Sequence, residues 1–116
     1  MSQKVFQNEG SLLGEVVMHR IRIKDLEGLR NILEDVKLME PIYSRFISKP
    51  IVRARLEMYE HSGGVKINNE DKRMWVYVSV MNDKSEEYDI ALWKILKYAS
   101  MYPDIEARLK KYIKIE

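Results

Sequence analysis

Two segments of the chain, residues 52–59 and 74–80, alternate between aliphatic side chains and side chains of a different kind. Successive residues of a β-strand point to opposite faces of a sheet, so each segment would present one aliphatic face and one second face. The second faces carry arginines and aromatic rings, namely Arg53, Arg55, Tyr59, Trp75 and Tyr77. Aromatic rings stack on bases and other planar groups, and guanidinium groups bind phosphates. The pattern predicts a sheet surface that binds single-stranded nucleic acid or another planar ligand.

A third segment, residues 15–23, extends this predicted surface. It reads as a strand whose non-core side carries Arg20 and Arg22. If the three strands belong to one sheet, the candidate binding site consists of Arg20, Arg22, Arg53, Arg55, Tyr59, Trp75 and Tyr77. The same residue types are enriched at protein interfaces, and tryptophan, tyrosine and arginine dominate their energetics. A homodimer or another protein partner bound through this face is therefore the alternative interpretation.

The remaining polar residues do not show the spacing of a catalytic or metal-binding site. Of the two histidines, His19 falls on the apolar side of its predicted strand, and His61 lies next to a glycine turn. Several carboxylates come at the start of a predicted helix, where acidic side chains stabilise the positive end of the helix dipole. These carboxylates are Asp83, Glu86, Glu87 and Asp89. We therefore expect a binding module rather than an enzyme, without a metal site or a cofactor. An enzyme with a divalent metal ion bound by these carboxylates is a third hypothesis.

The composition is that of one folded domain. The chain has 116 residues, with 20 basic and 18 acidic side chains and no cysteine. Because the total charge is nearly balanced, any basic surface must arise from segregation of the charges. The lack of cysteine excludes disulfides and thiolate metal sites, and no apolar run approaches the roughly 20 residues that span a bilayer. We expect a cytoplasmic protein that has no membrane partner.

The spacing of apolar residues predicts the elements that hold the candidate surface. Residues 26–40 and 84–101 show helical spacing, and Pro41 is expected to end the first helix because it disfavours helical geometry in the preceding residue. Residues 51–81 are expected to form a hairpin with a long connector. Residues 41–48 are compatible with one or two helical turns.

The two ends of the chain are less defined by their patterns. Residues 104–116 fit either a helix or a strand. Residues 1–14 are expected to be a flexible segment or a short extra strand, which leaves residues 15–116 as a single domain. The element order indicates an α+β fold in which an antiparallel sheet carries helices on one face, in a ferredoxin-like arrangement or one close to it. A winged-helix fold is the alternative, with the hairpin as the wing and residues 41–48 as the recognition helix.

Overall fold

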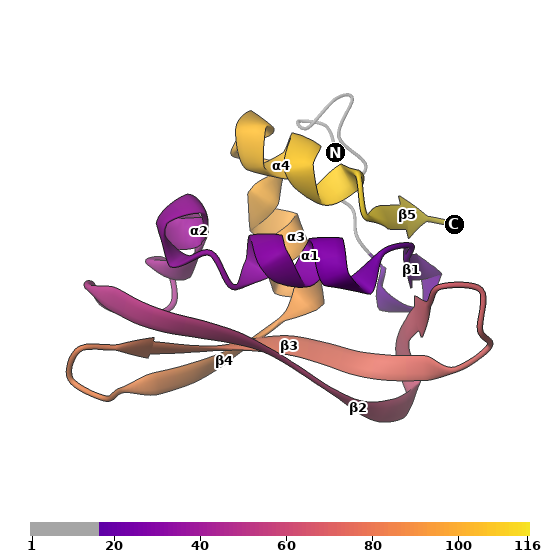
Figure 1. The fold of residues 1–116 in the computed structure, drawn as a ribbon, viewed down its shortest axis with the longest axis horizontal. Helices are drawn as coiled ribbons and strands as arrows, with labels where there is room; N and C mark the ends of the chain where they lie inside the picture. The colour runs from indigo at the N-terminus through magenta and orange to yellow at the C-terminus, as the bar shows by residue number, and fades with distance from the viewer. Residues whose placement is uncertain (1–16) are drawn as a thin grey trace, which may run out of the picture.

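The computed structural model describes residues 17–116, which form a five-stranded sheet with helices on one side (Figure 1). The strands are β1 (Ile21–Ile23), β2 (Ile51–Ile67), β3 (Arg73–Asn82), β4 (Glu87–Ala91) and β5 (Ile113–Ile115). Their order in the sheet is β4-β3-β2-β1-β5. The pair of β1 and β2 is parallel, and the other neighbours are antiparallel.

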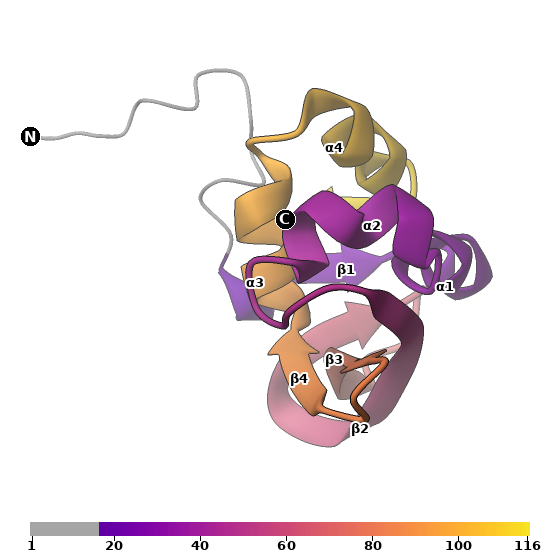
Figure 2. The same ribbon diagram turned by 90° about the vertical axis from the view of Figure 1, so that its left-hand side faces the viewer.

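Four α-helices cover the sheet in the described part of the chain. They are α1 (Leu26–Leu33), α2 (Val36–Tyr43), α3 (Leu92–Ala99) and α4 (Pro103–Lys110). Figure 1 shows them together on one side of β2, β3 and β4, and Figure 2 shows the same layers from the side. The buried side chains of the strands face these helices, as the row Val76, Val78 and Val80 of β3 illustrates. The predicted α+β class is confirmed, and the choice between a ferredoxin-like and a winged-helix arrangement stays a prediction.

Two predicted elements in the first third of the chain are wrong in detail. In the described part of the strand predicted over residues 15–23, the chain forms a 3₁₀ turn at Met18–Arg20 followed by the short strand β1, and His19 is exposed. The helix predicted over residues 26–40 is the two helices α1 and α2, because the Asp35 side chain accepts a hydrogen bond from the Leu38 amide at 3.1 Å and starts a new helix. Pro41 lies inside α2 and does not end it.

The largest correction concerns residues 84–101, which the spacing predicts to be one helix. The first part is instead a turn followed by β4, and only Leu92–Ala99 is helical. The buried Asn82 side chain closes the turn, since its carbonyl oxygen accepts from the amides of Lys84 and Glu86 at 3.0 and 3.1 Å. The acidic residues predicted at a helix start therefore lie on a β-hairpin. This places Glu87 and Asp89 in the sheet beside β3.

Strand β2 is bent, and the bend decides which strands can join the sheet. The register with β3 shifts between Glu60 and Val65, which marks an irregularity of the β-bulge type. Gly64 lies inside it, where an added Cβ would come within 2.0 Å of the main-chain oxygen of Met74. Beyond the bend, Lys66 and Ile67 pair with β1, and β1 pairs with β5. The tail thus forms both elements left open by its pattern, first the helix α4 and then the strand β5.

Residues 1–16 lie outside the described part, and so does the expectation of a flexible segment or extra strand over residues 1–14. Within residues 17–116, no helix combines the length and the apolar character that crossing a bilayer requires.

Candidate ligand-binding face

The sheet surface that points away from the helices is called the open face here. On β2 and β3 it carries the residues that alternate with the buried ones, as the pattern predicts. Ala54 and Leu56 are buried on the helix side, while Arg53 and Arg55 are exposed. Val52 departs from the prediction and is 53% exposed, because the register with β3 shifts between Ile51 and Arg53. The aliphatic row therefore points inward with this one exception in the β2 segment.

Four rings gather in the middle of the open face and form what we call the aromatic cluster: Tyr59, His61, Trp75 and Tyr77. Tyr59 lies directly opposite Trp75 in the register. Its ring centroid is 6.3 Å from that of Tyr77 and 6.5 Å from that of His61, and His61 is 5.8 Å from Trp75. All three ring pairs have the edge-to-face geometry that aromatic rings prefer. Because Tyr59 is 51% exposed and Trp75 and Tyr77 are partly exposed, ring surface remains open for a ligand.

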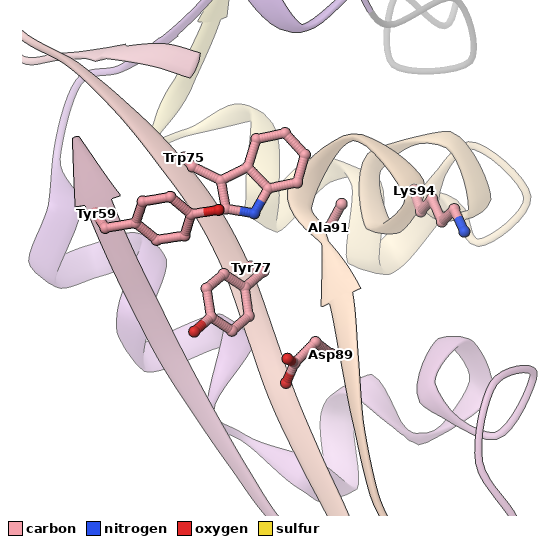
Figure 3. A pocket seen from close by; sticks show the side chains of 6 residues that line it. All are labelled: Tyr59, Trp75, Tyr77, Asp89, Ala91 and Lys94. Atoms are coloured by element: carbon pink, nitrogen blue, oxygen red, sulfur yellow. The ribbon is translucent and has the colours of Figure 1, made fainter. Parts of the chain in front are cut away.

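The aromatic cluster borders a pocket of about 250 Å³. Figure 3 shows Tyr59, Trp75 and Tyr77 on β2 and β3, with Asp89 of β4 beside Tyr77. Desolvation raises the pKa of Tyr77 above its ordinary value of 10.0, and the carboxylates of Asp89 and Glu57 raise it further. The Tyr77 phenol is therefore neutral at physiological pH, and its hydroxyl is available as a hydrogen-bond donor.

His61 belongs to the cluster although the sequence analysis did not select it. Its Nδ1 accepts a hydrogen bond from the Gly63 amide at 3.1 Å, which orients the ring toward Trp75. The signal in the sequence was the strand period itself, since His61 follows Tyr59 by two residues. The glycine pair Gly63-Gly64 is typical of a turn and predicts an earlier end of the strand, whereas β2 continues through both glycines to Ile67.

One end of the open face has both signs of charge and is called the charge-balanced end. It consists of Arg53, Arg55, Glu87 and Asp89. Arg53 forms an ion pair with Glu87 at 3.0 Å, across Met81 of β3. Arg55 and Asp89 lie on either side of Ser79 in the register. The two predicted arginines are therefore offset by carboxylates that β4 brings into the sheet.

The other end of the open face carries a row of four cations, called the basic row here. The register aligns one residue from each of four neighbouring strands: Arg73 of β3, Lys66 of β2, Arg22 of β1 and Lys114 of β5. Directly paired residues of neighbouring strands lie on the same face of a sheet. Arg73 precedes Trp75 by two residues on β3, so the basic row adjoins the aromatic cluster.

Three side chains of the basic row contact neutral main-chain oxygens or one carboxylate that two of them share. Arg73 donates to the main-chain oxygens of Gly64 and His19 at 2.7 and 3.2 Å, which leaves its charge without a carboxylate partner in these contacts. Arg22 and Lys66 share one carboxylate, that of Glu116, at 2.6 and 3.6 Å. Lys114 is exposed. This end of the face is accordingly positive.

A second pocket, of about 400 Å³, lies where the aromatic cluster meets the basic row. His61 and Arg73 line it together with Ser62, Lys72 and two acidic residues, Glu60 and Asp71. Glu60 is paired with Lys72 at 3.0 Å. Among residues 17–116, no three side chains of the His, Asp and Glu types gather into a possible metal site.

The structure distributes the predicted site residues over the open face unequally. Tyr59, Trp75 and Tyr77 form its centre, and Arg53 and Arg55 form the charge-balanced end. Arg22 belongs to the basic row, while Arg20 lies in the 3₁₀ turn and donates through Nε to the main-chain oxygen of Glu116.

Comparison of the chain with protein families, with curated proteins and with solved structures found no match. The functional argument therefore rests on the geometry of this face.

Proposed function

We propose that this protein is a small non-enzymatic module that binds single-stranded nucleic acid on its open face. One observation carries the proposal: the aromatic cluster continues directly into the basic row on the same sheet surface. Trp75 and Arg73 are two residues apart on β3, which corresponds to about 7 Å along a strand. A nucleotide strand presents bases and phosphates at comparably short intervals, so both groups can be contacted at once.

The two parts of the face contribute different interactions. Tyr59, Trp75 and Tyr77 offer ring surface on which bases stack, and each stacked base contributes about 1–3 kcal/mol without requiring a particular sequence. Lys66, Arg73 and Lys114 supply positive charge for the phosphates, and their binding is weakened by salt because counterions are released. The expected ligand is consequently a flexible single strand, whose bases are free to turn toward the rings.

The test is a titration of a fluorescently labelled single-stranded 12-mer with the protein, followed by anisotropy at low and at moderate salt. Binding that weakens as the salt concentration rises supports the proposal, and no binding at low salt overturns it. Trp75→Ala should weaken binding about 5- to 150-fold, which corresponds to the loss of one stacked base.

A matched control for Trp75→Ala removes a ring from the opposite face. Tyr88 is 42% exposed, lies opposite Val80 in the register, and stacks on Phe46 on the helix side. Tyr88→Ala should leave oligonucleotide affinity within about two-fold of the wild type, because the ring is not on the open face. Equal losses in both variants would point to a general effect on the fold.

The charge-balanced end supports a second candidate function, a homodimer formed through the same face. A two-fold interface brings the same patch of each copy together, so charged residues within the patch can pair across the interface only when both signs are present. Arg53, Met81 and Glu87 provide this arrangement in a single row. Light scattering coupled to size exclusion tests it: a dimer that Met81→Asp dissociates supports the candidate, and a strict monomer at high concentration removes it.

A further inference from the structure

Three basic side chains from three different elements converge on one residue, Glu116, at the basic end of the open face. Arg22 of β1 approaches Oε2 of Glu116 with Nε at 2.6 Å, and Lys66 of β2 approaches Oε1 with Nζ at 3.6 Å. Arg20, from the 3₁₀ turn, donates through Nε to the main-chain oxygen of the same residue. Two of the three cations thus contact the side-chain carboxylate of Glu116, and the third contacts the main chain of the same residue.

The Arg22 side chain and the spacing of the two strands are held in place independently of the carboxylate. Arg22 also donates through Nη1 to the main-chain oxygen of Asn68, which fixes its guanidinium at the end of β2. The parallel pairing of Arg22 with Lys66 sets the distance between the two strands. The Arg22 side chain is 20% exposed and that of Glu116 is 32% exposed, so the cluster is partly shielded but open to solvent on one side.

The chemistry of such a cluster suits a phosphate better than a carboxylate. A phosphate group has more oxygens than a carboxylate, and a guanidinium fork matches two of them at once. In the present contacts Arg22 offers only Nε to the Glu116 carboxylate, while Nη1 is used elsewhere. The hydrogen bond from Arg22, and then the charges of Arg22 and Lys66, keep the pKa of the Glu116 carboxyl below its ordinary 4.5, so the occupant is an anion at neutral pH.

We propose that Arg22 and Lys66 form a phosphate-binding site, with Arg20 held beside it by the main chain of Glu116, and that the Glu116 side chain occupies this site in the free protein until a ligand phosphate displaces it. That the ligand is a nucleic acid rests on the proposed function. The site itself requires only that the ligand carries a phosphate group. Its consequence is competition within the chain: binding of a phosphate at this end is opposed by the Glu116 carboxylate.

The test is calorimetric titration with inorganic pyrophosphate and, separately, with the single-stranded 12-mer. Glu116→Gln removes the competing charge and keeps the size of the side chain, so both ligands should bind about three- to five-fold more tightly, as expected for release of a partly exposed ion pair. Glu27→Gln is the matched control, because Glu27 on α1 is 78% exposed and the substitution changes the net charge equally. Lys66→Gln should reduce pyrophosphate binding in either background.

The outcomes separate this site from the proposed function. Equal affinities in Glu116→Gln and Glu27→Gln, with oligonucleotide binding retained, overturn the site and leave the function standing. Tighter pyrophosphate binding in Glu116→Gln, without oligonucleotide binding in any variant, supports the site and overturns the function. If Glu116→Gln does not fold, pyrophosphate binding by the wild type that Lys66→Gln abolishes supports the site, and binding that Lys66→Gln leaves unchanged overturns it.

Discussion

The two ends of the open face both carry basic residues but differ in electrostatic character. At the charge-balanced end, Arg53 is paired with Glu87, and Asp89 lies in the same row as Arg55. At the basic end, Lys66 and Arg22 share one carboxylate and Lys114 adds a further charge. The difference arises from the outer strands, because β4 contributes carboxylates and β5 contributes a lysine. The charge of a sheet face is therefore set by neighbouring strands as much as by the strands that carry the arginines.

The largest expected effect comes from breaking the connection between the two ends. Gly64→Ala places a Cβ within 2.0 Å of the Met74 main-chain oxygen, at the bend of β2 that brings β1 and β5 into the sheet. The backbone must shift to accept it, and we expect a loss of about 3 kcal/mol in the free energy of unfolding. Chemical denaturation measures this loss.

The neighbouring glycine provides the control for this substitution. A Cβ on Gly63 would meet only the His61 ring, at 3.3 Å, which a small movement of a side chain relieves. Gly63→Ala should therefore cost less than 1 kcal/mol. Equal stability of the two variants would show that the bend does not depend on the close approach at Gly64.

The next largest effect is a difference in oligonucleotide affinity between variants of the basic row and variants of the charge-balanced end. Lys66→Gln combined with Lys114→Gln removes two charges from the basic row, and we expect about a ten-fold loss of oligonucleotide affinity and a salt slope smaller by about 1.4. Arg53→Gln combined with Arg55→Gln removes the same charge from the charge-balanced end. Its effect should be much smaller because nearby carboxylates already offset those arginines. Anisotropy titrations over a range of salt concentrations compare the pairs, and equal losses would contradict the distinction.

The smallest effect concerns how the charge-balanced end acts on the aromatic cluster. Since Asp89 is one of the groups that raise the pKa of Tyr77, Asp89→Asn should bring that pKa closer to its ordinary value. Because the pKa of Tyr77 is raised, the folded state holds the phenol proton more tightly than the unfolded state does. The contribution of Tyr77 to the free energy of unfolding is therefore present below pH 10.0 and is lost as the pH rises through the folded-state pKa. Phenolate absorbance during alkaline titration measures the change, which Lys114→Gln should not produce.

The sequence predicts which side chains of β2 and β3 point inward and which point outward, because strand alternation acts between neighbouring residues. The period of two places Ala54 and Leu56 inward and Tyr59 outward without knowledge of the rest of the chain. The inward side chains of β3 follow in the same way. These faces are determined locally, and the structure confirms them.

The ends of the site could not be predicted in this way. The basic row aligns Arg22, Lys66 and Lys114, which come together only through pairing of segments far apart in the sequence. Strand β4 was hidden within a stretch of helical apolar spacing, and the turn before it depends on the buried side chain of Asn82. As a result, the apolar spacing places the carboxylates that offset Arg53 and Arg55 at a helix start instead of on the open face.

The central claim is that a ligand strand contacts the aromatic cluster and the basic row together. Nuclear magnetic resonance of the ¹⁵N-labelled protein during titration with the single-stranded 12-mer tests it directly. We expect the amide signals of Tyr59, Trp75, Lys66 and Lys114 to shift together at the same oligonucleotide concentration, while those of Arg53 and Glu87 stay in place. Shifts confined to the charge-balanced end or to the helices, or no shifts at low salt, would contradict it.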